Sequence, residues 1–406
     1  MDMESRTFRA VGYPLRLHSG DNALAQMRTE VERQKARRAF VICGRTVATK
    51  TDLPARIQAE LGELYAGAFE AMGKDSDWPS VQQAVEAARA ADADLLIAVG
   101  GGSVIVGTRV VAILLAEKGD PFDLMTQYPE GKPAYSPRLM APKPPIINVP
   151  TTPTSAMNRA GSGLKNEDLD HRMEYFDPKT RPTALFWDAG ALMTAPPELI
   201  RSTATTGFSS ALRLLGARVL TPLVEADRRH AFHLLHGALP RIMEEPDNAA
   251  IRIDLCCAAF LENRAADDDQ GRRRDWDQTA ANSYALATAL HIRYDHVWQG
   301  ESTSTVIPTV TRLTPPKDID VAQRVAGALG VWRDGMTAEA AAEATAAGLD
   351  DIYRRIGMPT RLHELDIPRK DLPLLAQDTL KNFNANPGDR PGDYTAHMLS
   401  LLEAAW

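Results

Sequence analysis

Two short motifs rich in glycine and threonine follow apolar runs in the first half of the chain. The apolar run 95–99 leads into a Gly-Gly-Gly-Ser segment, and the run 146–149 leads into Pro-Thr-Thr. Glycines at a strand end let the backbone approach a pyrophosphate, and a helix that follows offers unpaired N–H groups with partial positive charge. The two motifs together predict a dinucleotide diphosphate site. The residues assigned to it are Gly100, Gly101, Gly102, Ser103, Thr151 and Thr152.

The choice of nucleotide depends on the residues that follow an apolar strand at 38–43. A carboxylate there would accept hydrogen bonds from the ribose 2′-hydroxyl and repel a 2′-phosphate. This chain has Gly44 and Arg45 instead, and a guanidinium can pair with a phosphate. The alternative is that Gly44 only forms a turn and Arg45 is only solvated. We therefore predict NAD(P) as the cofactor, with a preference for NADP.

Strands and helices alternate in the first half of the chain. Apolar periodicity predicts strands at 38–43, 65–69 and 95–99 and helices at 53–64, 79–90 and 104–118. This alternation is typical of a parallel, doubly wound α/β sheet. Beyond residue 195 the patterns are helical, and 304–307 is the main β-branched run. We predict a dinucleotide-binding α/β domain at 1–195 and an all-α domain at 196–406, with irregular loops at 122–145 and 267–275.

Composition excludes several classes of protein. The 406 residues carry a net charge of −7, which argues against a nucleic-acid-binding surface. No apolar run approaches the roughly 20 residues that span a bilayer, and no secretory signal is visible. Three cysteines, two of them adjacent, give no disulfide framework. We expect a cytoplasmic protein.

Several segments together resemble a known family. These are 99–103, 150–152, the helix around Gly207 and the C-terminal segment 383–387. They are similar to the iron-containing (group III) alcohol dehydrogenases, and 66–69 and 94–103 most resemble the maleylacetate reductases within that superfamily. The resemblance implies the dehydroquinate synthase-like, iron-alcohol-dehydrogenase fold. It also implies hydride transfer in a cleft between a nucleotide domain and a helical domain.

The chain departs from the family pattern in its nucleotide half. The family commonly has Asp three residues after the serine of the glycine motif, where this chain has Val106. The family usually continues the Pro-Thr-Thr motif with a turn that ends in Glu. Here the corresponding segment, 153–158, ends in Asn158. We assign Asn158 as a substrate contact.

The resemblance also implies that the family's metal ligands are replaced. Family members that use iron or zinc take Asp and His four residues apart on one helix and two later His. Residues at i and i+4 share a helix face, so both can reach one ion. Alignment on that pattern gives Ser209, Arg213, Tyr284 and Gln299 at the four positions. A cation at the second position would repel a metal ion, so we predict a metal-free site.

These positions suggest a mechanism without a metal. We assign Arg213 the positive charge that stabilises the substrate oxygen, with Ser209 and Tyr284 as hydrogen-bond donors. Proton transfer is assigned to His291 or His296. Further substrate contacts are assigned to Gln299, Arg272, Arg273 and Arg274. Another histidine trio, at 230, 233 and 236, is interpreted as structural or surface-exposed.

The leading hypothesis is a metal-independent NAD(P)-dependent oxidoreductase for a secondary alcohol or ketone. Similar proteins occur beside peptide natural-product (daptide-like) pathways, which suggests a β-hydroxy acid or a peptide C-terminal residue such as threonine. One alternative is a catalytically degenerate nucleotide-binding scaffold that pairs with another biosynthetic enzyme. Another is an enoate or keto-acid reductase of the maleylacetate reductase type. Expected partners are a small-molecule or peptide substrate and a second copy in a homodimer, with no nucleic acid and no membrane.

Overall fold

A computed structural model describes residues 3–129, 132, 134–169, 171–217, 220–268, 277–380 and 394–406. The chain divides into two compact units. The sheet unit comprises Gly12–Pro196 and Asp247–Cys256, and the helical unit comprises Met1–Val11, Pro197–Pro246 and Cys257–Trp406. The sequence predicted two continuous domains, 1–195 and 196–406. In the structure, Met1–Val11 belongs to the helical unit and Asp247–Cys256 belongs to the sheet unit.

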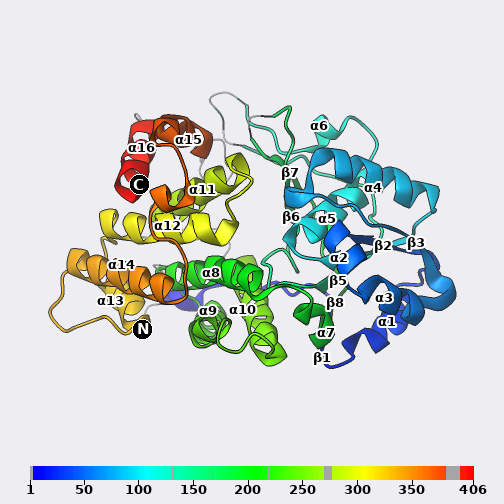
Figure 1. Cartoon of the computed structure of the whole chain (residues 1–406), viewed down its shortest axis with the longest axis horizontal. Helices are drawn as coiled ribbons and strands as arrows, with labels where there is room; N and C mark the ends of the chain where they lie inside the picture. The colour runs from blue at the N-terminus through cyan, green and yellow to red at the C-terminus, as the bar shows by residue number, and fades with distance from the viewer. Residues whose placement is uncertain are drawn as a thin grey trace. The chain divides into compact units, whose positions relative to one another are not determined.

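The sheet unit is built on six strands, and every neighbouring pair is parallel. The strand order is β1-β8-β5-β4-β2-β3. The strands are β1 (Arg16–Gly20), β2 (Ala39–Cys43), β3 (Tyr65–Phe69), β4 (Leu95–Gly100), β5 (Ile146–Pro150) and β8 (Ala184–Asp188) (Figure 1). The predicted parallel α/β fold is confirmed. Sequence patterns did not reveal β1, because this edge strand carries a single large apolar residue, Leu17.

Successive side chains of each strand point to opposite faces of the sheet. The central strands are buried throughout, so both faces are apolar and helices cover both. On one face Val41, Ile97 and Val149 share a buried core with α1 (Met27–Arg33) and α3 (Leu53–Leu61). On the other face α4 (Trp78–Ala90) and α5 (Gly102–Ala116) contact β3, β4 and β5 (Figure 1). From β2 the chain continues outward to β3, whereas from β4 it continues in the other direction to β5 and β8. The direction therefore changes between the neighbouring strands β2 and β4. The carboxyl ends of these two strands are therefore the place where such sheets bind ligands.

The sheet unit also contains elements that the sequence did not predict. An antiparallel hairpin is formed by β6 (Gly161–Leu164) and β7 (Met173–Phe176). The segment predicted as an irregular loop, 122–145, begins within the short helix α6 (Pro121–Leu124) and contains the isolated bridge between Gln127 and Tyr135. The unit also contains α2 (Arg45–Lys50), α7 (Ala189–Met193) and the first part of α10 (Ala249–Asp268).

The second half of the chain is helical, as predicted. Its helices are α8 (Pro197–Leu214), α9 (Pro222–Ala238), α10 (Ala249–Asp268), α11 (Asp277–Arg293), α12 (Gln299–Leu313), α13 (Ile319–Ala328), α14 (Ala338–Arg355), α15 (Leu372–Thr379) and α16 (Tyr394–Ala405). The β-branched run 304–307 lies inside α12 and is buried, so packing outweighs the weak helix propensity of these residues. The predicted loop 267–275 starts as the end of α10. Its remaining residues, and the motif at 383–387, lie outside the described residues.

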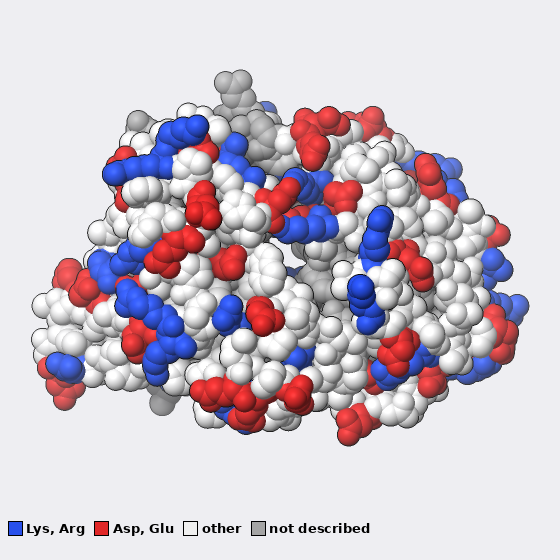
Figure 2. Space-filling view, viewed as in Figure 1, with Lys and Arg blue, Asp and Glu red and all other residues white. Residues whose placement is uncertain are grey.

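The helices and the surface charge of the described residues can be compared with what the composition predicts. No described helix combines the length and the apolar character that a membrane crossing requires. Basic and acidic side chains are interspersed over much of the face shown in Figure 2.

Within the sheet unit, a buried ion cluster joins the segment 122–145 to the residues around Glu117 and Asp177. The Nζ of Lys143 lies 2.5 Å from Oε1 of Glu117 and 3.0 Å from Oδ2 of Asp177, and the lysine side chain is fully buried. Burial alone would raise the pKa of Glu117, but Lys143 and the N–H of Ala141 outweigh burial and hold this pKa below its usual value. Asp177 behaves alike, because Lys179 and Lys143 outweigh its burial and lower its pKa.

Glu117→Gln is expected to lower the free energy of unfolding by about 1–2 kcal/mol at neutral pH, where the ion pair is intact. A carboxyl whose pKa is lower in the folded state stabilises at neutral pH and loses that contribution as the pH falls through its folded pKa. The difference between wild type and variant should therefore shrink as the pH falls below about 4.5, the ordinary pKa of a glutamate, and vanish once the folded carboxyl is protonated. Urea unfolding across this pH range measures it. The control is Glu245→Gln, which alters an exposed pair with Arg241. A difference independent of pH would contradict the role of the charge.

Candidate functional site

The glycine motif lies at the carboxyl end of β4. Gly100 has a φ of +155°, and a Cβ at this position would lie 2.7 Å from Cγ2 of Val104, so glycine is required. Gly101 has an extended backbone and precedes α5, whose first residue is Gly102. The amino end of a helix of 15 residues carries unpaired N–H groups and partial positive charge.

The threonine motif packs directly across these glycines. Gly100 pairs with Pro150 in the β4–β5 ladder, and the N–H of Thr151 donates to the carbonyl of Gly100 at 3.1 Å. A Cβ added at Gly101 would lie 3.3 Å from Oγ1 of Thr152. Both threonines are buried. The structure therefore brings the two predicted motifs together at one edge of the sheet.

Ser103 makes different contacts from those that the sequence suggested. Its Oγ accepts a hydrogen bond from the N–H of Asp75 at 3.0 Å, and its carbonyl accepts one from Oγ of Ser76 at 2.6 Å. These bonds hold the turn after β3 against the start of α5. In this structure Ser103 supports the glycine turn, and its hydroxyl has a protein partner.

Gly44 lies beside the glycine turn, and two opposite charges flank it. A Cβ at Gly44 would lie 3.3 Å from the carbonyl of Met72 and 3.8 Å from Cγ2 of Val104. Arg45 is exposed at the start of α2. Glu70 directly follows β3, which pairs with β2 in a register that places it beside Cys43. Burial raises the pKa of the Cys43 thiol to about 12, and the nearby charge of Glu70 adds to that effect. Sequence analysis did not identify Glu70.

A buried arginine holds the loop that follows the threonine motif. Arg109 lies on α5 and is 1% exposed. Its Nη1 donates to the carbonyls of Ala156 and Arg159 at 2.6 and 2.9 Å, and its Nη2 donates to Gly161 at 2.8 Å. Burial lowers the pKa of this guanidinium to about 9, with a further effect of the charges of two neighbouring arginines. Arg109 could not be identified from the sequence, because a single arginine in an apolar helix forms no pattern.

Asn158 lies in that loop and is 8% exposed. Its carbonyl accepts a hydrogen bond from Nη1 of Arg181 at 2.9 Å. The preceding carbonyl, of Met157, accepts one from Nδ2 of Asn148 at 2.8 Å. The loop that carries the predicted substrate contact is therefore held at several backbone positions.

The residues that the sequence predicts at the family's metal-ligand positions lie in the helical unit. Ser209 is buried on α8, and its hydroxyl donates to the carbonyl of Thr205 at 2.8 Å. The hydroxyl of Tyr353, on α14, lies 2.5 Å from Oγ of Ser209. Arg213 donates from Nε to the carbonyl of Ser209 at 3.2 Å and from Nη1 to Oγ of Ser283 at 2.8 Å. Sequence analysis did not identify Tyr353 or Ser283.

This donor set does not fit a divalent cation. The guanidinium of Arg213, at the predicted second ligand position, repels a cation, and the hydroxyl of Ser209 already has two protein partners. Tyr284 follows Ser283 on α11 and is half-buried, whereas Gln299 is exposed at the first turn of α12. Within the described ranges, no group of three or more His, Cys, Asp or Glu side chains is placed to hold a metal ion.

The two candidate acid–base histidines are bonded to backbone carbonyls. His291 is buried on α11, and its Nδ1 lies 2.8 Å from the carbonyl of Ala287 in the same helix. His296 lies in the turn before α12, and its Nε2 lies 3.0 Å from the carbonyl of Leu365. The trio at 230, 233 and 236 is exposed on α9. Arg272, Arg273 and Arg274 lie outside the described residues.

Known proteins match almost the whole chain. Residues 14–189 match the model of the iron-containing alcohol dehydrogenase family, and residues 217–406 match the model of the C-terminal region of Fe-containing alcohol dehydrogenases. Maleylacetate reductase 2 of Cupriavidus pinatubonensis is 26% identical over 254 residues, which span 63% of this chain and 62% of that protein. Lactaldehyde reductase of Escherichia coli is 23% identical over 95% of this chain and 97% of its own length.

The fold is shared with solved structures as well. NADH-dependent butanol dehydrogenase A of Thermotoga maritima superposes with a TM-score of 0.84 over 98% of both chains, at 17% identity. Both halves of the sequence match the same family, and the sheet unit and helical unit have its fold. The chain therefore belongs to the iron-containing alcohol dehydrogenase family and is an oxidoreductase.

Proposed function

We propose that this chain is a metal-independent, NAD(P)-dependent oxidoreductase that interconverts a secondary alcohol and a ketone. The observation that carries the proposal is the hydrogen-bonded guanidinium of Arg213, on the helix position where relatives that use a metal have His. It donates to Ser209 and Ser283 and is partly buried. A fixed positive charge with low exposure can stabilise an alkoxide oxygen, which is the task that a metal ion has in other dehydrogenases.

The sheet unit supplies the residues that would hold the nucleotide. We assign the diphosphate to the glycine turn, to the first N–H groups of α5 and to Thr151 and Thr152. The amino end of a helix and backbone amides in a glycine turn are suited to a diphosphate. When bound, the nicotinamide ring supplies or accepts the hydride. Names of relatives, such as NADH-dependent butanol dehydrogenase, support a nucleotide of this class.

The preference between NADP and NAD depends on two charges near Gly44. Arg45 is exposed and favours a 2′-phosphate, whereas Glu70 beside Cys43 favours a 2′-hydroxyl. We assign NADP(H) as the preferred form, because Arg45 is exposed and is the second residue after β2, directly after Gly44. Side-by-side binding titrations with NADPH and NADH test this assignment.

In the helical unit the proposed roles differ in how directly the residues act. Arg213 stabilises the developing charge on the substrate oxygen. Ser209 acts indirectly, because its only hydrogen is donated to the carbonyl of Thr205. Tyr284 is assigned as a further donor to the oxygen, and His291 or His296 as the group that moves the proton. Asn158 and Gln299 remain assigned as substrate contacts.

The substrate class follows from this chemistry and from the relatives. We propose a secondary alcohol that carries a nearby carboxylate, such as a β-hydroxy acid or the C-terminal residue of a peptide in a natural-product pathway. The match to maleylacetate reductase 2 favours keto-acid reduction as a second candidate. The protein is proposed to act in the cytoplasm as a homodimer.

The test of the function is turnover after removal of metals. Purified protein, dialysed against a strong chelator, should still consume reduced nucleotide with a keto acid, as followed by near-ultraviolet absorbance. Elemental analysis of the same sample should find no stoichiometric zinc or iron. Nucleotide binding without turnover on any carbonyl would favour a degenerate scaffold. Activity that is lost on chelation and restored by a metal would end the metal-independent proposal.

Gly101→Asp is expected to weaken nucleotide binding without weakening the fold. Gly101 is the residue that precedes α5, with φ −81° and ψ −163°, and Asp is favoured at such an N-cap position. A carboxylate there would repel the diphosphate by about 2 kcal/mol, which is about a thirtyfold increase in Kd. Calorimetric titration measures the Kd. Thermal unfolding should give a Tm close to that of wild type, because the helix cap offsets the close approach of the new Cβ to Oγ1 of Thr152.

The matched control for this substitution is Gly101→Asn. Asn has nearly the same shape and also caps a helix, but it carries no charge. The Kd of the Asn variant should stay within a few-fold of wild type. Equal affinities for the Asp variant and wild type would mean that the diphosphate lies elsewhere.

A further inference from the structure

The buried hydroxyl of Tyr353 has a defined direction of donation. The hydroxyl of Ser209 has one hydrogen, and it donates that hydrogen to the carbonyl of Thr205 at 2.8 Å. Tyr353 must therefore be the donor in its own bond to Ser209, at 2.5 Å. Its side chain is fully buried, and its ring meets that of Phe208 edge to face with centroids 6.5 Å apart. The phenol is thus fixed by packing as well as by hydrogen bonding.

Ser209 connects this phenol to Arg213. The hydroxyl of Ser209 accepts from Tyr353, and the carbonyl of the same residue accepts from Nε of Arg213 at 3.2 Å. Nη1 of Arg213 continues the chain to Ser283 on α11. Ser209 is therefore bonded by α14 at its hydroxyl and by Arg213 at its carbonyl, and Arg213 in turn reaches α11. Arg213 is also near enough to Tyr353 to lower its pKa, although burial has the larger effect and raises it.

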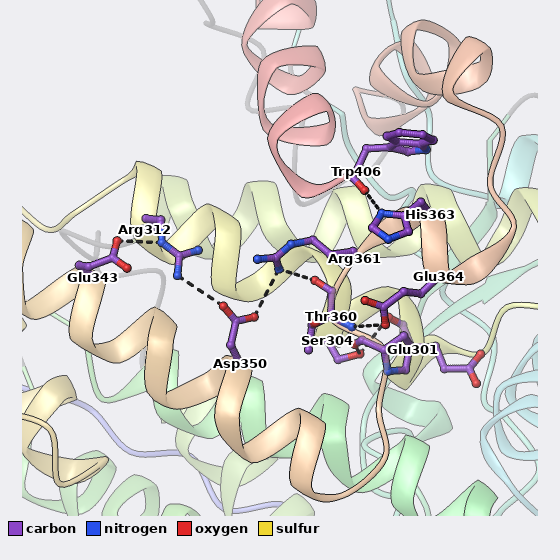
Figure 3. Close-up of polar contacts among 11 residues, drawn as sticks. Glu301, Ser304, Arg312, Glu343, Asp350, Thr360, Arg361, His363, Glu364 and Trp406 are labelled. Carbon is purple, nitrogen blue, oxygen red and sulfur yellow. Dashed lines mark hydrogen bonds and ion pairs between the residues drawn. The ribbon is translucent and has the colours of Figure 1, made fainter.

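The helix that carries Tyr353 is itself held in place. Asp350, one turn earlier on α14, lies 3.4 Å from Nη2 of Arg312 and 3.4 Å from Nη1 of Arg361 (Figure 3). Oγ of Ser304, on α12, donates to the carbonyl of Pro359 at 2.6 Å. Figure 3 shows Asp350 between the two guanidinium groups, with Arg312 also reaching Glu343. These contacts fix α14 and the segment after it against α12.

We propose that Tyr353 is a positioning residue for Arg213. The fixed phenol holds Ser209, and Ser209 in turn fixes the guanidinium through its carbonyl. The inference rests on the proposed role of Arg213 in the reaction. No feature of the sequence around residue 353 predicts it, because the bond joins residues 144 positions apart.

Tyr353→Phe removes the hydroxyl and keeps the ring. The variant is expected to lower kcat about tenfold while the KM for nucleotide stays within about twofold, because Arg213 is misplaced but nucleotide contacts are not touched. Ser209→Ala should have a similar effect. The double variant should lose little more than the worse single variant, because both changes remove the same bond. The matched control is Tyr294→Phe, which removes a hydroxyl that donates to Oδ2 of Asp371 at 2.8 Å in the same unit and should keep wild-type kcat.

A readout independent of turnover separates this inference from the proposed function. In arginine-labelled protein, the Nε–H resonance of Arg213 can be assigned by its loss in Arg213→Lys. It should shift or broaden in Tyr353→Phe and stay unchanged in Tyr294→Phe. An unchanged resonance, or a wild-type kcat in Tyr353→Phe alongside a depressed kcat in Arg213→Ala, would overturn the inference and leave the proposed function standing. A shifted resonance in a protein without turnover would instead support the positioning contact and end the proposed function.

Discussion

Replacement of Arg213 by alanine is expected to lower kcat about 100- to 1000-fold. Removal of one preorganised donor to a developing oxyanion has this magnitude in comparable sites. The Kd for nucleotide should stay within about twofold of wild type, because the residues assigned to the nucleotide belong to the sheet unit and Arg213 belongs to the helical unit. Steady-state kinetics with the best carbonyl substrate, and nucleotide titration of the same sample, measure the two effects separately.

Two further variants show whether the geometry or only the charge of Arg213 is needed. Arg213→Lys keeps a cation but cannot donate to both Ser209 and Ser283 as the guanidinium does, so its kcat should fall between those of wild type and Arg213→Ala. Arg229→Ala is the control, because Arg229 is an exposed residue of α9 paired with Glu225. Wild-type turnover in Arg213→Ala would remove this residue from the mechanism and would leave the oxygen without an assigned positive charge.

The meeting of the glycine motif and the threonine motif was predictable because their signals are local. Gly100 must be glycine because any Cβ there would collide with the side chain of Val104, only four residues later in the sequence. The Thr151–Thr152 pair follows β5 as the glycine motif follows β4, and parallel neighbouring strands bring their carboxyl ends to the same edge. Strand and turn chemistry that repeats in this way can be read from sequence without knowledge of tertiary contacts.

Residues that act through distant contacts were not predictable. Glu70 reaches Cys43 only because β3 pairs with β2, and Tyr353 reaches Ser209 from another helix. The hydroxyl of Ser209 was expected to face the substrate, yet it bonds to a carbonyl of its own helix. Ser and Thr side chains in helices commonly do this, and the sequence does not say which of the two bonds will form.

Arg109→Met is expected to lower the free energy of unfolding by about 3–5 kcal/mol, the largest stability effect among the changes considered. Arg109 donates four hydrogen bonds, to the carbonyls of Ala156, Arg159 and Gly161 and to the hydroxyl of Ser162. Methionine fills a similar volume but donates nothing. Each buried acceptor left without a partner costs about 1–3 kcal/mol, partly recovered where water enters. Urea unfolding measures the difference, with the exposed Arg241→Met as the control.

Arg109→Lys separates the charge from the geometry of the guanidinium. An ammonium has three donors at one point, so it cannot reach both the Nη1 acceptors and Ser162, and roughly half of the stability loss should remain. The loop that these bonds hold begins just after Thr152 and contains Asn158. Both variants should therefore also weaken nucleotide binding, and the lysine variant should do so less. If Arg109→Met unfolds like wild type, water or a rearranged loop satisfies the three carbonyls. The buried guanidinium would then not be what holds this loop.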